Sequence, residues 1–101
     1  MAEKNQNLSK YMEKLRQNLS IVKEEYSVNT LEVFGSYVRA EEQEISDLDI
    51  LVTFSEIPGL FRFIAFENHL TDLLGVKVDL VMKDALKPAI GERILAEALA
   101  V

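Results

Sequence analysis

The chain has 101 residues, of which 49% are hydrophobic and 28% are charged, a composition typical of globular proteins and not of disordered or fibrous ones. A chain of this size removes about two-thirds of its unfolded surface from water on folding, so we expect a single domain over residues 1–101. Cysteine is absent, which excludes disulfides, thiolate metal sites and a catalytic thiol.

Charge and hydropathy limit the partners and the location of the protein. The formal net charge is −6, which opposes binding to a phosphate backbone, because sequence-independent nucleic-acid affinity comes mostly from Lys and Arg. Long DNA or RNA is therefore not expected as a partner. Apolar runs stay well below the roughly 18 to 20 residues that cross a bilayer, and MAEKNQNLSK lacks the apolar core of a signal peptide. We expect a cytoplasmic protein with no membrane partner.

The first half of the chain predicts a helix, a strand and a polar loop. Apolar residues recur at three- and four-residue spacing from Leu8 to Tyr26, which is typical of an amphipathic helix. Asn7 or Ser9 is its candidate N-cap. A β-type run follows at Thr30 to Phe34, and the polar stretch from Tyr37 to Ser46 is expected to form a loop or a helical turn.

The second half alternates strands and helices. Leu48 to Phe54 is apolar on both faces, as in a central strand covered on two sides. Leu60 to Leu74 has helical spacing and is followed by Gly75, a favoured left-handed C-cap. Val76 to Met82 alternates as a strand, and Pro88 opens a last helix to about Ala98. The order predicts an α/β (α+β) fold, a small mixed sheet of at least three strands flanked by helices.

Three aspartates are expected to share one face of this sheet. Side chains two apart on a strand point the same way, so Asp47 and Asp49 project together while Leu48 and Ile50 face the other side. Asp79 has the matching parity in its own strand. If the two strands are neighbours, the three carboxylates converge on one patch at an edge of the sheet.

Such a patch predicts a divalent metal site. Two like charges 4 Å apart repel by about 4 kcal/mol at an effective dielectric near 20, and a cation removes that penalty. Oxygen ligands without sulfur suit Mg²⁺, with Mn²⁺ as an alternative. Two ions about 3.5 to 4 Å apart would stabilise the attacking and leaving oxygens of an in-line displacement. The structural alternatives are a turn and cap pair for Asp47 and Asp49, and neutralisation of Asp79 by Lys77.

A glycine and a serine after the first strand are candidate phosphate ligands. Gly35 and Ser36 open a turn where free backbone N–H groups and a hydroxyl can hold phosphate oxygens. Glycine lets a phosphate approach the backbone closely. Arg39 is a possible further contact to the phosphates, and the alternative is a solvated or salt-bridged side chain.

The segment FGSYVRAEEQEISDLDILV resembles the signature of the DNA polymerase β-like nucleotidyltransferases, in which Gly-Ser, ten intervening residues and then Asp-x-Asp lead into an apolar strand. The chain is especially similar to the MNT-type minimal members, the antitoxins of HEPN/MNT toxin–antitoxin pairs. The closing segment VDLVMKDALKPAIGERILAEALAV also resembles that family, with its third aspartate and its Leu-Lys-Pro turn. The likeness covers Leu31 to Val101.

The resemblance implies a polymerase β-like nucleotidyltransferase fold and a Mg²⁺-dependent transfer of AMP from ATP. It implies that Gly35 and Ser36 hold the triphosphate, that Asp47 and Asp49 bind metal, and that Asp79 completes the metal site and helps to deprotonate the acceptor hydroxyl. The implied acceptor is a partner protein, a HEPN toxin. The chain departs from the family in its loop, where Arg39 is followed by alanine instead of glycine and Glu41, Glu42 and Glu44 add negative charge.

Two other functions fit the same residues. A non-catalytic antitoxin could neutralise a basic toxin by binding it through the acidic loop. A regulatory module could bind ATP without transferring it. A pure binding module needs no divalent metal and should tolerate Asp47→Asn.

Overall fold

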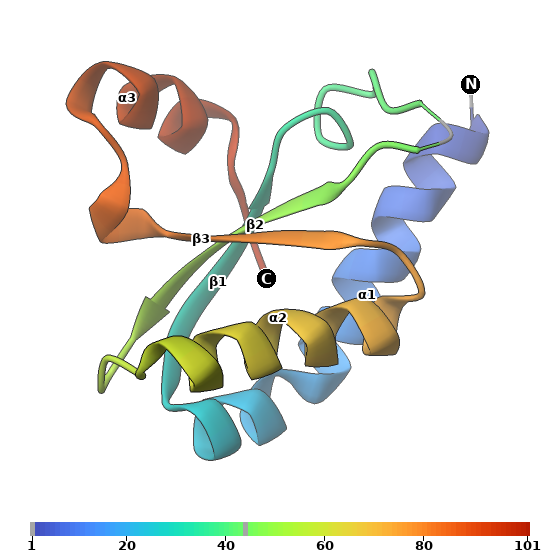
Figure 1. The fold of residues 1–101 in the computed structure, drawn as a ribbon. Helices are drawn as coiled ribbons and strands as arrows, with labels where there is room; N and C mark the ends of the chain where they lie inside the picture. The colour runs from blue at the N-terminus through green and yellow to red at the C-terminus, as the bar shows by residue number, and fades with distance from the viewer. Residues whose placement is uncertain (1, 44) are drawn as a thin grey trace.

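The computed structural model describes residues 2–43 and 45–101, with side chains described from Asn7 onward. The elements, in chain order, are α1 (Ala2–Tyr26), β1 (Val28–Phe34), β2 (Leu48–Phe54), α2 (Leu60–Leu74), β3 (Val78–Met82), the 3-10 turn η1 (Lys83–Ala85), α3 (Pro88–Glu97) and β4 (Leu99–Ala100). Figure 1 shows the described helices flanking one twisted sheet.

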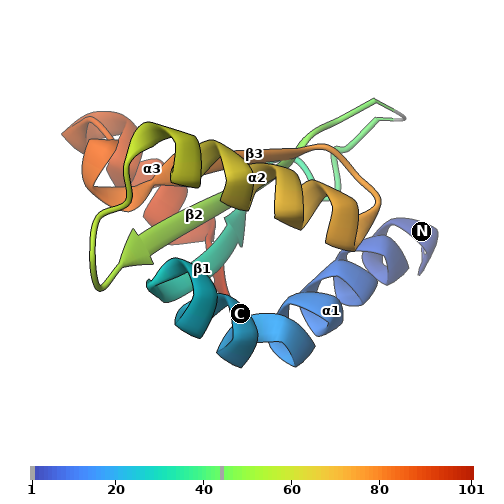
Figure 2. The same cartoon turned by 60° about the horizontal axis from the view of Figure 1, so that its bottom comes forward.

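The sheet is mixed, with the strand order β3-β2-β1-β4. β2 and β3 are parallel, and β1 is antiparallel to both β2 and β4. Parallel crossover connections are right-handed, and the β2-to-β3 and β3-to-β4 crossovers run in opposite directions across the sheet. α2 and α3 therefore lie on opposite faces (Figure 1). Figure 2 shows α2 lying across β2 and β3.

The hydrophobic core lies between the sheet and the pair α1 and α2, which contact each other. Alternate residues of the strands point into it, because the side-chain period of a strand is two. The buried set comprises Met12, Leu15, Val22, Val28, Leu31, Val33, Tyr37, Leu48, Ile50, Val52, Phe66, Leu70, Leu74, Val78 and Leu80. Asp49 and Asp79 lie on the other face of β2 and β3, together with the buried Leu51.

Three elements begin at a different residue than the sequence predicts. β1 begins at Val28 instead of Thr30. α1 begins at Ala2 instead of Leu8, so Asn7 and Ser9 lie inside the helix and the predicted cap is wrong. The segment before Leu8 has no glycine or proline to stop a helix. The third strand begins at Val78, not at Val76, because the α2-to-β3 turn takes two residues after Gly75.

The remaining elements agree closely with the prediction, with one addition. β2 and α2 have the predicted bounds, and Gly75 is the left-handed C-cap of α2, with φ of 70° and its N–H donating to Thr71 O. Pro88 is the first residue of α3, which ends at Glu97. The short β4 was not predicted. It pairs with β1, where Val33 faces Leu99.

α2 also covers the exposed edge of β3. The Val78 N–H donates to Thr71 Oγ1 at 3.1 Å, and the Leu80 N–H donates to Glu67 Oε2 at 2.9 Å. An unpaired strand edge is a template for aggregation, so such capping protects the sheet. It also fixes the backbone on both sides of Asp79. Within the described part of the chain, none of the helices is long and apolar enough to cross a membrane.

Candidate functional site

Gly35 forms a tight turn directly against the carboxylate of Asp49. Its φ is +87°, a left-handed conformation, and a Cβ built there would lie 2.1 Å from Asp49 Oδ2. Only glycine fits both requirements. The Gly35 carbonyl accepts hydrogen bonds from the N–H groups of Val38 and Arg39 at 3.0 and 3.2 Å, which closes the turn that carries Ser36.

The carboxylates lie at the amino ends of the parallel strands β2 and β3. Asp49 and Asp79 are register partners across these strands, so their side chains project from neighbouring positions on the same face. Asp47 immediately precedes β2 and has the same parity as Asp49. The predicted convergence of the three carboxylates required neighbouring strands, and β2 and β3 are neighbours.

This crowding of negative charge changes the protonation of Asp49. Burial raises the pKa of its carboxyl to about 6, and the charges of Asp79 and Asp47 add to the increase, while Arg39 opposes it. A hydrogen bond with Asp79 also favours the protonated form. The environment of Asp49 thus resists a bare negative charge and favours either a proton or a cation.

The donor set fits a hard divalent cation, although the three carboxylates are not gathered into a ready-made cage. Within residues 7–43 and 45–101, no three acidic or histidine side chains stand close enough together to hold a common ion. Asp49 and Asp79 are the closely placed pair, and Asp47 lies two residues before Asp49, just ahead of β2. Mg²⁺ often takes only one or two protein carboxylates and completes its shell with water and nucleotide phosphates, which agrees with this arrangement.

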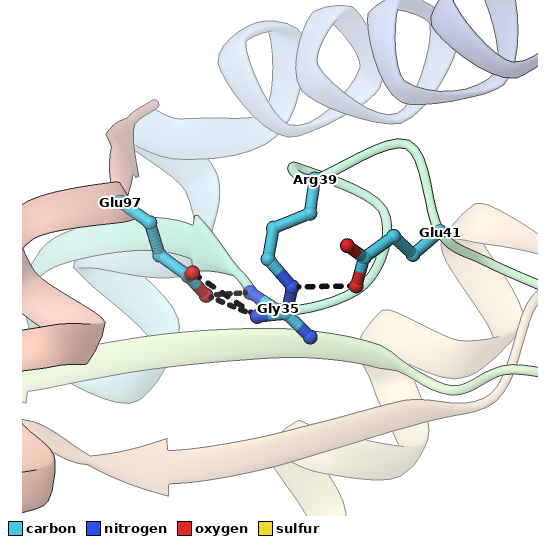
Figure 3. Close-up of polar contacts among 4 residues, drawn as sticks. All are labelled: Gly35, Arg39, Glu41 and Glu97. Carbon is cyan, nitrogen blue, oxygen red and sulfur yellow. Dashed lines mark hydrogen bonds and ion pairs between the residues drawn. The ribbon is translucent and has the colours of Figure 1, made fainter.

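Arg39 is held by two carboxylates, those of Glu41 and Glu97. Its Nε donates to Glu41 Oε1 at 3.0 Å, and its Nη1 lies 3.0 Å from both oxygens of Glu97. The Gly35 N–H donates to Glu97 Oε2 at 2.7 Å. Figure 3 shows Glu97 reaching from the end of α3 into the turn. The salt-bridged alternative for Arg39 is therefore what the structure shows. Nothing local in the sequence marks Glu97, because its partners lie 58 and 62 positions away.

The residue after Arg39 keeps a conformation that normally favours glycine. Ala40 has φ of +59°, in the left-handed region that costs an L-residue roughly 1 to 2 kcal/mol. The loop thus keeps a left-handed turn at the position where the resemblance leads one to expect glycine. The alanine retains the turn conformation at a local energetic cost.

Surface hollows do not coincide with the carboxylates. A groove of about 710 Å³ lies between α1 and β4 and contains none of the aspartates. A smaller cavity of about 150 Å³ adjoins the turn and is lined by Arg39, Ile90, Arg93, Ile94 and Glu97. We place the site by its chemistry, beside the second cavity, because neither the aspartates nor the Gly-Ser turn line the larger groove.

The turn and the carboxylate pair thus lie together on one face of an α/β domain. A family model described as the nucleotidyltransferase domain matches residues 15–101. The protein adenylyltransferase MntA of Thermococcus cleftensis is 51% identical over 78 residues, which span 77% of this chain and 79% of the relative.

Solved structures give the same result for the fold. A structure assigned to a minimal nucleotidyltransferase has a TM-score of 0.74 and 34% identity, with 89% of this chain and 92% of that one covered. A tri-AMPylated Shewanella oneidensis HEPN toxin in complex with its MNT antitoxin matches with a TM-score of 0.59 and 20% identity, covering 96% and 70%. The chain belongs to the nucleotidyltransferase family and is one of its MNT-type minimal members. It is a nucleotidyltransferase enzyme.

Proposed function

We propose that this chain transfers AMP from ATP to a hydroxyl group of a partner protein, a HEPN-type toxin. The observation that carries the proposal is the close approach of Gly35 to Asp49, which puts the Gly-Ser turn against the acidic pair. Support for the donor and acceptor comes from the relative named a protein adenylyltransferase and from the AMPylated toxin of the structural neighbour.

In this proposal, the turn binds the nucleotide and the carboxylates bind the metal. Gly35 and Ser36 hold the triphosphate, because backbone N–H groups and a hydroxyl are suitable donors to phosphate oxygens. Asp47, Asp49 and Asp79 hold Mg²⁺, two ions in the full site, with Mn²⁺ as a substitute. When bound, the metal neutralises the phosphate oxygens and supplies charge stabilisation in the transition state.

Asp79 also acts as the proton acceptor. The acceptor hydroxyl attacks the α-phosphorus in line, a new phosphorus–oxygen bond forms, and the bond to the β-phosphate oxygen breaks with release of pyrophosphate. The hydroxyl proton passes to the Asp79 carboxylate, which is exposed on the edge strand. Correct positioning of the hydroxyl supplies about 7 to 11 kcal/mol of the barrier, so a partner that presents it rigidly completes the site.

The test is transfer to the protein encoded next to this one. The neighbour, ATP and Mg²⁺ are incubated with wild type, Asp79→Asn and the matched control Asp72→Asn, which removes the same charge from an exposed position on α2. Intact-mass spectra should show one or more AMP additions to the neighbour with wild type and Asp72→Asn, and none with Asp79→Asn.

A non-catalytic antitoxin is the competing function, and the same experiment separates it. The described acidic residue Glu41 is exposed on the loop, where it could meet a basic toxin surface. If the chain neutralised the toxin without adding AMP to it, and Asp47→Asn neutralised it equally well, the function would be simple binding and not transfer. Robust transfer to a small molecule by the chain alone would exclude the protein acceptor.

A further inference from the structure

The Glu97 carboxylate occupies the Gly35 N–H, which the proposed function assigns to the nucleotide, and a guanidinium beside it. It accepts from the Gly35 N–H at 2.7 Å and from Arg39 Nη1 at 3.0 Å through both of its oxygens. A backbone amide together with a guanidinium is a typical donor set for a phosphate. The Glu97 carboxylate thus binds where a nucleotide phosphate is expected.

The surroundings of Glu97 form an anion pocket once that carboxylate is set aside. The adjoining cavity of about 150 Å³ is lined by two arginines, Arg39 and Arg93, and Glu97 is its one acidic lining residue. Arg93 lies four positions before Glu97 on α3, so both side chains project from one face of the helix. Arg39 keeps Glu41 on its Nε, so its terminal nitrogens can turn to a new partner.

The carboxylate and a phosphate cannot both use these donors. The Gly35 N–H carries a single hydrogen, already committed at 2.7 Å, and its Cα side is closed by Asp49. A triphosphate beside an unmoved Glu97 would also meet a repelling charge. Binding therefore requires Glu97 to leave.

We propose that Glu97 is an internal stand-in for a nucleotide phosphate, and that ATP binds by displacing its carboxylate from Gly35 and Arg39. This proposal rests on the proposed nucleotide site and adds to it the residue that sets nucleotide affinity. Glu97 is the last residue of α3 and lies two positions before β4. Its release therefore also loosens the tie between α3 and the Gly-Ser turn.

Nucleotide affinity in charge-matched variants tests the displacement. ATP with Mg²⁺ is titrated calorimetrically into wild type, Glu97→Gln and Glu92→Gln, which removes the same charge from an exposed position on the same helix. Glu97→Gln should bind ATP about three- to tenfold more tightly than wild type, because a charge-assisted contact no longer competes. Glu92→Gln should stay within about twofold of wild type.

The outcomes separate this proposal from the proposed function. Binding by wild type with equal or weaker binding by Glu97→Gln overturns the stand-in role and leaves the nucleotide site intact, since Glu97 then positions Arg39. Binding by Glu97→Gln alone supports displacement strongly. Absence of ATP binding in both proteins overturns the nucleotide site and the stand-in role together.

The unmodified chain provides a second measurement that does not depend on how the variant folds. In nuclear magnetic resonance spectra of labelled wild type, ATP with Mg²⁺ should shift both the Gly35 amide and the side-chain carboxyl carbon of Glu97. A shift at Gly35 with an unchanged Glu97 carboxyl would show that both groups remain in contact and would contradict displacement. The exposed Glu92 carboxyl is the internal reference.

Discussion

At the scale of single residues, Asp49 links the acid–base chemistry of the site to folding stability. Its pKa is raised to about 6 by burial and by the neighbouring Asp79 and Asp47, above the ordinary aspartate value of about 3.9. The folded protein therefore binds a proton at Asp49 more tightly than the unfolded chain does. This contribution to stability is fully present below the unfolded pKa and is lost as the pH rises through about 6.

Asp49→Asn should therefore stabilise the metal-free protein at neutral pH. In urea unfolding with a chelator present, the variant should gain about 1 to 2 kcal/mol over wild type at pH 7.5, allowing for screening, and little at pH 4. Mg²⁺ with ATP should raise the melting temperature of wild type and leave that of the variant unchanged. An equal difference between the two proteins at both pH values would show that Asp49 does not titrate in this window.

Gly35 should be the glycine least able to accept a side chain. Gly35→Ala combines a left-handed φ with a methyl 2.1 Å from the Asp49 carboxylate, so we expect a loss of about 2 to 4 kcal/mol. Gly75→Ala has the strained φ with open space around it and should lose about 1 kcal/mol. Gly59→Ala, with φ of −72° and open space, is the control and should be neutral. Equal unfolding free energies for the three variants would contradict the contact at Gly35.

Ala40 is a position where a change to glycine, instead of from glycine, should stabilise the protein. Replacing it by glycine should relieve the left-handed φ of +59° and stabilise the loop by about 0.5 to 1 kcal/mol, less the entropy that glycine adds to the unfolded chain. Thermal or urea unfolding measures the effect. Ala65→Gly, in the exposed middle of α2, should instead destabilise by about 0.5 to 1 kcal/mol. A destabilised Ala40→Gly protein would argue against the left-handed turn.

At the scale of elements, α2 positions Asp79 by bonding the strand edge on either side of it. Thr71→Val should leave the Val78 N–H without its acceptor, and Glu67→Ala should do the same at Leu80. Each should cost about 1 to 3 kcal/mol, the penalty of an unsatisfied donor, and should speed amide exchange at those two residues. Asp72→Ala on the same helix is exposed and should change neither quantity. Unchanged exchange in Glu67→Ala would show that the Glu67 carboxylate does not protect the Leu80 amide.

The elements predicted well from the sequence are those whose signals are local. β2 is apolar on both faces, and α2 carries a long periodic pattern that ends in glycine, so their bounds agree with the structure. The helical period of about 3.6 residues also places Phe61 and Phe66 on different sides of α2, since Phe66 is fully buried and Phe61 is 88% exposed. The start of α1 was missed because polar caps and polar helix residues look alike without a breaker between them.

The parts that could not be predicted depend on contacts between distant segments. The two-residue β4 has no pattern of its own and exists because β1 offers it a free edge. The partner of Arg39 on α3 is likewise set by the crossover that brings the end of that helix to the turn. That the aspartates share one face could be predicted, because strand parity is a local property. Their convergence also required the two strands to be neighbours, and β2 and β3 do pair in parallel.

At the scale of the whole molecule, the two faces of the sheet have different tasks. One face is closed by α1 and α2 and supplies the core, and the other carries the carboxylates, the turn and α3. The net charge of −6 acts over both faces and disfavours the compact state through self-repulsion. The described ion pairs, Arg39 with Glu41 and Glu97 and Lys83 with Glu32, offset only part of it.

Moderate salt should therefore stabilise the metal-free protein. Raising NaCl from 20 mM to about 300 mM shortens the Debye length to well below 10 Å, so repulsion among exposed carboxylates should weaken and the urea midpoint should rise. Urea unfolding of the chelator-treated chain at both salt concentrations gives the sign directly. A fall in the midpoint would mean that the few surface ion pairs outweigh the excess of acidic side chains.

The missing Cβ at position 35 makes substitutions at positions 35 and 49 depend on the order in which they occur. While an aspartate stands at position 49, a side chain at position 35 meets its carboxylate at once. If a descendant of this chain exchanged Asp49 for a small residue, the clash at position 35 would vanish and larger residues could settle there with only the backbone strain to bear. Restoring the aspartate would then collide with the new occupant. Loss of the chemistry would act as a ratchet, reversible only if both positions changed back together.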